Sequence, residues 1–264
     1  MVKKNIFTEE YKEIIKKYYP DFGYKKCQTF MPHLTQSQIG GMAKHLGVKF
    51  KRNHIGKISI ENFTCLSNES IYSLGLLWGD GYINKHNNQI KFHIKSTDRD
   101  YLLSILSKVG QWNLYTYPDG NSVEIACVDY KLHKWFCQYD FQEKSYYEPT
   151  KILSIIPKEK HFLFWLGLID ADGSFYTIKS ENRFKFSLTS TYDYKFYEFT
   201  NFCHKYNIEY KIRQRTSGTG KCSELEIQKI QSLLNLGKQI YQTEIGLPRK
   251  RIKFETFQSK RLSA

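Results

Sequence analysis

Two carboxylates, Asp80 and Asp172, stand at the same place in two similar nine-residue segments of this 264-residue sequence. Residues 73–81 read SLGLLWGDG and residues 165–173 read WLGLIDADG, so the two aspartates are 92 residues apart. Each segment has an apolar run that predicts a helix, followed by an acid and a glycine suited to ending it. Because a carboxylate at the negative end of a helix is unfavourably placed, the pattern predicts a cation beside each acid.

The small residues of the two segments predict that the two helices pack against each other. Gly75 and Gly79 are four residues apart, as are Gly167 and Ala171, so each pair lies on one helical face and allows close backbone approach. Either segment alone is typical of a buried core helix with a glycine cap. Two copies that both keep the acid favour a functional pair, and carboxylate oxygens suit a hard cation such as Mg²⁺ better than zinc.

The two segments resemble the motif of the LAGLIDADG homing endonucleases. The second segment carries Gly-Leu-Ile-Asp-Ala-Asp-Gly of that motif, and the first carries Trp78 where the family has an acid at position six. Both copies keep the acid at position eight. The resemblance implies an α+β fold of two pseudo-symmetric αββαββα halves, in which antiparallel sheets form a saddle and the motif helices form the interface.

The resemblance also implies a metal-dependent nuclease site. In the family the two acids and the carbonyls before them, here Gly79 and Ala171, hold the metal ions, and each half cuts one DNA strand. We therefore expect Mg²⁺ or another hard divalent cation such as Mn²⁺, with Ca²⁺ as a non-catalytic substitute. Such a cation activates water for in-line attack on a phosphodiester and stabilises the departing 3′-oxygen. The basic or polar residues that match the family's catalytic neighbours are Lys151, Lys250, Lys95 and Thr189.

The composition favours a globular protein with a polyanionic partner. Hydrophobic residues make up 41% of the chain, and 40 Lys and Arg oppose 26 Asp and Glu, a formal net charge of +14. Nucleic acid is favoured over a membrane surface, since no apolar run approaches the roughly 20 residues of a membrane span and no signal peptide is evident. We expect a soluble protein of a bacterial or phage-infected cytoplasm or an organelle. The six scattered cysteines indicate reduced packing residues and neither disulfides nor zinc.

Residues 1–65 are predicted to form a separate helical DNA-binding domain with a linker. They carry 12 Lys and Arg against five acids. Thr8 caps a predicted helix that Pro20 and Gly23 stop, and a second helix begins near Thr35. The segment is similar to small helix-turn-helix modules attached to phage and intron endonucleases; the alternative is an amphipathic cap on the main domain. The expected DNA contacts are Gln36, Ser37, Gln38, Lys44, Lys49, Lys51 and Arg52.

Residues 66–157 and 158–264 form the two predicted halves. In both, apolar and polar residues alternate with period two, for example in residues 90–95 and 184–189, which predicts half-buried strands with a polar outer face. DNA can lie on that face, although an ordinary solvated surface has the same pattern. The expected contacts are Lys91, His93, Lys95, Lys179, Lys185, Ser187, Thr189, Lys211, Arg213, Arg215 and Arg249.

The sequence thus predicts a monomeric homing endonuclease that makes a staggered break in a long, imperfectly palindromic double-stranded DNA target. One alternative is a non-cleaving DNA-binding regulator on the same fold, although such proteins usually lose the motif acids. The other alternative is a maturase that binds intron RNA, which the sequence separates poorly from a nuclease.

Overall fold

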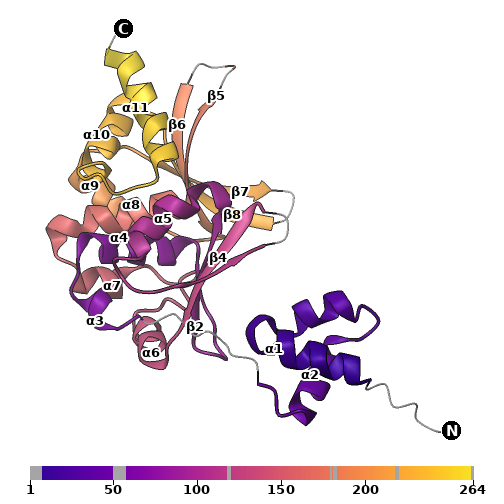
Figure 1. Ribbon diagram of the computed structural model, residues 1–264. Helices are drawn as coiled ribbons and strands as arrows, with labels where there is room; N and C mark the ends of the chain where they lie inside the picture. The colour runs from indigo at the N-terminus through magenta and orange to yellow at the C-terminus, as the bar shows by residue number, and fades with distance from the viewer. Residues whose placement is uncertain are drawn as a thin grey trace. The chain divides into compact units, whose positions relative to one another are not determined.

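The protein divides into two units. The computed structural model describes residues 8–49, 58–117, 120–178, 180, 183–217 and 220–262 (Figure 1). The first unit lies within residues 1–54 and the second within residues 55–264. This boundary comes before the predicted residue 65, because Ile58 and Phe63 are buried in the core of the second unit. No helix within the described ranges is long and apolar enough to cross a membrane.

The first unit consists of helices α1 (Glu9–Phe30) and α2 (Gln36–His45). Thr8 caps α1 as predicted, its hydroxyl accepting the backbone N–H of Tyr11 at 3.3 Å. Gly23 breaks the helix with a φ of 65°, whereas Pro20 lies inside it and does not end it. The helix then resumes as far as Phe30, so the predicted stop is a kink.

Helix α2 begins where the sequence predicts. Thr35 and Gln38 form a capping box, in which each side chain accepts the backbone N–H of the other residue. Ile39, Met42 and Ala43 are buried against residues of α1, which gives the first unit a hydrophobic core of its own. The unit is therefore a small helical module, and its binding to DNA stays a prediction.

The second unit contains two halves that share an order of elements, and the first half begins with one additional helix, α3. The first half comprises α3 (Glu61–Thr64), α4 (Asn68–Gly79), β1 (Gly81–Ile83), β2 (Gln89–Lys95), α5 (Arg99–Leu106), β3 (Asn113–Thr116), β4 (Ser122–Val128), α6 (Tyr130–Gln138) and α7 (Thr150–Ile155). The second half comprises α8 (His161–Asp172), β5 (Gly173–Ile178), β6 (Arg183–Thr191), α9 (Tyr197–Lys205), β7 (Lys211–Ser217), β8 (Gly220–Ile227), α10 (Ile230–Ile240) and α11 (Pro248–Leu262). The predicted αββαββα order is confirmed, and one further helix, α7 or α11, closes each half.

Each half contains one four-stranded antiparallel sheet. The strand orders are β1-β2-β4-β3 and β5-β6-β8-β7. The apolar residues of the alternating strands, such as Ile90, Phe92 and Phe186, are buried as predicted. Figure 1 shows the helices of the second unit gathered on one side and the strands on the other. The polar faces of both sheets are thus directed away from the helical layer.

The motif helices α4 and α8 pack with their backbones in contact. A Cβ atom on Gly75 would lie 2.0 Å from the carbonyl oxygen of Phe164, and one on Gly167 would lie 2.1 Å from that of Tyr72. Neither distance is possible for a real side chain, so only glycine fits at these two positions. The close approach predicted from the small residues is present, and it brings the ends of the two helices together.

Candidate active site between the motif helices

Asp80 and Asp172 lie at the carboxyl ends of the two motif helices. Asp80 caps α4, and Asp172 is the last residue of α8. The following glycines are required by close contact, because a Cβ on Gly81 would lie 2.4 Å from the carbonyl oxygen of Leu77, and one on Gly173 would lie 2.6 Å from that of Ile169. Gly173 has an extended conformation with φ −77° and ψ 151°. It caps α8, as the sequence predicts for a glycine that ends the helix, and its backbone is already extended because β5 begins there.

The two carboxylates repel one another and are poorly hydrated. Both side chains remain exposed, yet the surrounding protein displaces much of their water. This desolvation raises the pKa of Asp80, and desolvation together with the charge of Asp80 raises the pKa of Asp172 to about 6. Two accessible acids with raised pKa values favour a bound cation, and the cation itself stays a prediction.

Two lysines partly supply this positive charge. Lys144 Nζ donates to the carbonyl oxygen of Leu77 at 3.1 Å and to that of Gly79. Lys250 Nζ donates to the carbonyl oxygens of Ile169 and Asp170, both at 2.7 Å, and of Gly173 at 2.6 Å. Desolvation lowers the pKa of each lysine to about 8, although the charges of Asp80 and Asp172 act in the opposite direction. Each ammonium therefore binds the negative end of one motif helix.

Lys144 is the site residue that the sequence did not reveal. The residue predicted to match Lys250 was Lys151, but the Lys151 ammonium contacts Asp140 Oδ1 at 2.7 Å and does not reach the motif helices. Lys250 is the third residue of α11, whereas Lys144 precedes α7 by six residues in an irregular segment. No periodic pattern predicts where a side chain in such a segment points.

The residues present fit a hard divalent cation. Asp80 and Asp172 supply exposed carboxylates from two helices. The Gly79 carbonyl oxygen accepts a hydrogen bond from Lys144 and keeps a second lone pair for a cation. Lys250 bonds to the carbonyl oxygens of Ile169, Asp170 and Gly173, and not to that of Ala171. Within the described part of the chain, no three His, Cys, Asp or Glu side chains cluster as metal ligands. A cation that keeps several waters, such as Mg²⁺, suits two carboxylates better than zinc does.

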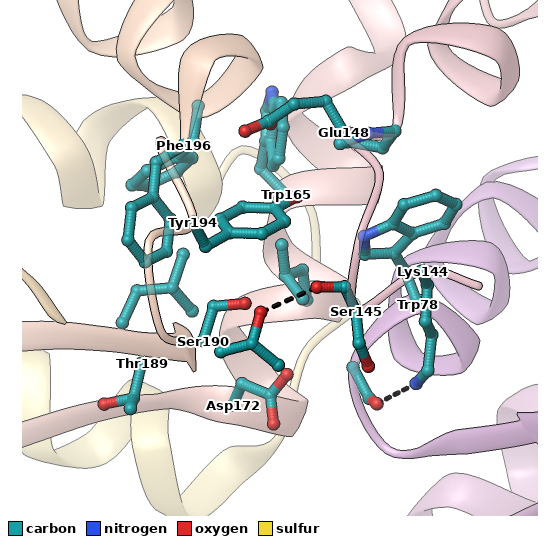
Figure 2. A pocket seen from close by; sticks show the side chains of 16 residues that line it. Trp78, Lys144, Ser145, Glu148, Trp165, Asp172, Thr189, Ser190, Tyr194 and Phe196 are labelled. Atoms are coloured by element: carbon teal, nitrogen blue, oxygen red, sulfur yellow. Dashed lines mark hydrogen bonds between the residues drawn. The ribbon is translucent and has the colours of Figure 1, made fainter. Parts of the chain in front are cut away.

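A hollow of about 360 Å³ adjoins Asp172, and we call it the Asp172 hollow. It combines Asp172 of α8 with Gly79 of α4 and with Lys144. Figure 2 shows aromatic rings gathered at one end of this hollow and Asp172 with Thr189 at the other. Its aromatic lining consists of Trp78, Trp165, Tyr194, Phe196 and Phe199.

The Asp80 hollow, of about 480 Å³, occupies the equivalent place beside the other acid. It combines Asp80 of α4 with Ala171 of α8 and with Lys250. Each hollow therefore takes its acid from one motif helix and its small residue from the other. The remaining charged and histidine residues of the Asp80 hollow are His93, Lys95, Asp98, Asp170, Arg249 and Lys253.

The strand registers identify the equivalent residues of the two hollows. Gly81 pairs with Phe92, and Gly173, its counterpart, pairs with Leu188. Lys95, three residues after Phe92, is therefore equivalent to Thr191. The sequence had matched Lys95 with Thr189, but the register shifts that match by two residues. Lys95 and Thr189 nevertheless line the two hollows, one in each.

Position six of the motifs differs between the halves. Asp170 is buried, and its Oδ2 accepts from the Tyr72 hydroxyl at 2.8 Å and from the backbone N–H of Leu247 at 2.6 Å. These bonds tie α4 and the start of α11 to α8, which positions Lys250. Desolvation raises the pKa of Asp170 to about 6. Trp78 instead packs edge-on against Phe141, with ring centroids 5.0 Å apart.

The basic residues of the first sheet lie on its polar face, as predicted, but most are not free. Lys91 Nζ is 2.8 Å from Glu124 Oε2, and His93 Nε2 is 3.1 Å from the same oxygen. Lys95 is exposed and has no ion pair among the residues described. One acid thus holds two of the predicted DNA-contacting side chains.

In the second sheet two buried glutamates, Glu224 and Glu226, pair with the basic side chains. Arg213 Nε lies 3.4 Å from Glu226, and Arg215 donates to Glu224 at 2.7 Å. Lys185 and Ser187 were expected to face the DNA, but they are only 8% and 6% exposed. They lie on β6, an inner strand of the second sheet, where Lys185 pairs with Tyr176 of β5 and Ser187 pairs with Glu226 of β8. The Lys185 ammonium is 4.0 Å from Glu226.

The other predicted DNA contacts are dispersed. Arg249 forms a bidentate pair with Asp98, with Nε 2.9 and 3.0 Å from the two oxygens, so it joins α11 to the residues before α5. Lys211 and Thr189 are exposed on β7 and β6. In the first unit the exposed residues are Gln36, Ser37, Gln38, Lys44 and Lys49. The predicted contacts Lys51, Arg52 and Lys179 lie outside the described residues.

Residues 159–241 match the family model of the LAGLIDADG-like domain. This segment is a LAGLIDADG-like domain. It begins just before α8 and ends just after α10, so it contains the second motif and the second sheet. No curated protein sequence matches the chain.

Solved structures extend the LAGLIDADG similarity to both halves. The homing endonuclease I-WcaI bound to its DNA recognition sequence has a TM-score of 0.50 and 15% identity, and the match covers 74% of this chain and 91% of that chain. I-DmoI in complex with DNA and Mn has a TM-score of 0.46 and 14% identity, covering 68% and 99%. Full-length DUF199/WhiA from Thermatoga maritima has 0.44 and 15%, covering 76% and 66%. The chain has the LAGLIDADG homing endonuclease fold with two repeated halves.

Proposed function

We propose that this protein is a site-specific DNA endonuclease that makes a staggered double-strand break by metal-dependent phosphodiester hydrolysis. The observation that carries the proposal is the paired construction of the two hollows. Each contains a motif acid, a small residue of the opposite helix and a desolvated lysine. A regulator that only binds DNA does not need two accessible acids at the negative ends of two helices.

Asp80 and Asp172, with the carbonyls of Gly79 and Ala171, would hold the divalent cation. When bound, the cation would supply a Lewis acid for the phosphate and activate water. Lys144 and Lys250 hold the carbonyls at the helix ends in place, and their charges act on both carboxylates. The same ammonium groups are available to offset negative charge that builds up on the phosphate during hydrolysis.

The sheets would bind one half-site each. Their equivalent positions differ, for instance Lys91 in β2 and Ser187 in β6, so an imperfectly palindromic target fits better than a perfect one. The glutamates hold Lys91, Arg213 and Arg215 in defined orientations, which favours contact with base edges over general attraction to phosphates. The first unit would add DNA contacts through the exposed face of α2, and one chain would suffice for both cuts.

The test is to incubate the full-length protein with Mg²⁺ and a library of random-sequence duplexes, and to sequence the ends produced. The DNA that flanks its own gene, joined without the insertion, is a second substrate. Discrete staggered cuts that EDTA abolishes are the expected result. Sequence-specific retention of duplexes without any cut would contradict the proposal and favour a DNA-binding regulator. If neither occurs, binding to the intron RNA of the host gene becomes the function to test.

A further inference from the structure

The two hollows differ in the positive charge that they offer to a phosphate. The Asp80 hollow contains Lys95 from β2 and Lys253 from α11, both exposed. Neither ammonium has an ion-pair or hydrogen-bond partner among the described residues. Both are therefore available to a ligand that enters beside Asp80.

The acids of the Asp80 hollow, other than Asp80 itself, are already compensated. Asp98 is paired with Arg249 through three contacts of 2.9 to 3.0 Å. Asp170 is buried and accepts hydrogen bonds from Tyr72 and Leu247. These two acids consequently do little to offset the charge of Lys95 and Lys253.

Among the residues that the structure describes, no such free cation lines the Asp172 hollow. Thr191 stands where Lys95 stands in the other half, and its hydroxyl donates to the carbonyl oxygen of Ser145 at 2.6 Å. Lys144, the lysine of this hollow, already donates to the end of α4. Glu148, the other acid of this hollow, accepts the backbone N–H of Tyr197 at 3.0 Å, so it is engaged in the same way as Asp170. Aromatic rings line one end of this hollow, as Figure 2 shows.

A phosphodiester undergoing hydrolysis gains negative charge, and cations held beside it lower the barrier. This effect is larger in a hollow walled by protein than in open water, since the effective dielectric constant is lower. Two unpaired ammonium groups beside Asp80 should therefore favour hydrolysis there.

We propose that the two sites cut at unequal rates, and that the strand whose scissile phosphate enters the Asp80 hollow is cut first. Lys95 and Lys253 set this order, and a nicked duplex precedes the double-strand break. In each cut, water adds to phosphorus, the P–O3′ bond breaks and a proton passes to the 3′-oxygen, leaving a 5′-phosphate and a 3′-hydroxyl. The inference rests on the proposed nuclease function.

The experiment follows the two strands separately. Duplexes recovered from the random library are labelled with a different dye on each strand and mixed with saturating full-length protein and Mg²⁺, so that binding affinity does not limit the rate. We expect one strand to be cut roughly tenfold faster than the other, with a transient nicked duplex. Equal rates for the two strands would overturn this inference and leave the nuclease proposal intact; no cutting of either strand would overturn both.

Variants identify the residues responsible. The double substitution Lys95→Thr, Lys253→Thr should slow the faster strand by roughly tenfold and leave the slower strand unchanged. Equal slowing of both strands would contradict the assignment. Thr191→Lys should accelerate the slower strand relative to Thr191→Val, the matched control that removes the same hydroxyl without adding charge. Equal rates for these two variants would count against an effect of local charge.

Discussion

The two halves of the second unit share a framework and differ in what fills it. Both have a glycine at the helix contact, an acid at the helix end and a lysine bonded to the last carbonyls. At position six, however, one half has the buried Asp170 and the other has Trp78. The glycines are shared because no other side chain fits at the helix contact. The acids and lysines are shared because they supply the charges of the site. Position six instead serves local packing, and each half solves that problem differently.

The two lysines reach equivalent places in the site from different kinds of chain segment. Lys250 reaches its carbonyls from the first turn of a 15-residue helix, whereas Lys144 reaches its own from an irregular segment before a six-residue helix. Equivalent positions in space are therefore not equivalent positions along the chain. Substituting the same feature in each half tests whether the two halves are functionally equivalent.

The largest expected effect is on the paired acids. Asp80→Asn and Asp172→Asn should each reduce double-strand cutting by about 10³-fold or more, because each variant loses a charged ligand for the cation. DNA binding, measured by gel shift in Ca²⁺, should be largely retained. Asp100→Asn is a matched control, since the Asp100 side chain is 84% exposed and, among the described residues, forms its ion pair with its neighbour Arg99. Full cutting by either active-site variant would refute the site.

The helix contact should respond alike in both halves. Gly75→Ala and Gly167→Ala should each lower the free energy of unfolding by about 3 kcal/mol, because the added methyl group meets a backbone carbonyl that cannot move away. Thermal unfolding followed by circular dichroism measures the loss. Gly41→Ala in α2 is the control, as its Cβ meets nothing within 4 Å. A loss at only one of the two glycines would show that the halves are not equivalent at their interface.

The assignment of Lys144 is tested against that of Lys151. Lys144→Met should slow cutting by about 10²-fold, as the partly buried charge beside the acids is lost. Lys151→Met should change the rate little, since the Lys151 side chain is 60% exposed and pairs with Asp140. Single-turnover rates at saturating DNA separate catalysis from binding. If Lys151→Met slowed cutting more than Lys144→Met, Lys151 would be the counterpart of Lys250, as the sequence predicted.

The smallest effect concerns position six and depends on pH. Because the folded state raises the pKa of Asp170 to about 6 from about 3.9 in the unfolded chain, the folded state binds the proton more tightly. The contribution of Asp170 to the free energy of unfolding should therefore be most favourable below pH 4. It should fall by roughly 2 to 3 kcal/mol as the pH rises through 6. Asp172 contributes a smaller slope of the same sign, because its side chain is exposed and solvent screens its charge.

Asp170→Asn should remove most of that slope, because it keeps an oxygen for Tyr72 and Leu247 but carries no charge. Urea unfolding between pH 4 and pH 7.5, followed by tryptophan fluorescence, reports on the second unit, which contains all four tryptophans. An unchanged slope would show that Asp170 is not the titrating group. Trp78→Phe, the corresponding substitution in the other half, should leave the slope unaltered.

The sequence by itself determined the elements and the acids. Period-two alternation placed β2 and β6, the capping residues placed the starts of α1 and α2, and the repeated segments predicted both the contact of α4 with α8 and the position of Asp80 and Asp172. Local periodicity predicts the helices and strands. The paired glycines and acids predict that the two motif helices pack against each other. The resemblance to LAGLIDADG proteins came from the same residues.

Only the tertiary structure decided which other side chains reach the site. It brought Lys144 to the end of α4, left Lys151 with Asp140, and matched Lys95 with Thr191. It also buried Lys185 beneath its neighbours on the second sheet. The reason is physical: periodicity fixes the direction of a side chain within a helix or strand, whereas irregular segments, strand register and the cover given by neighbouring strands depend on contacts between residues distant in the chain.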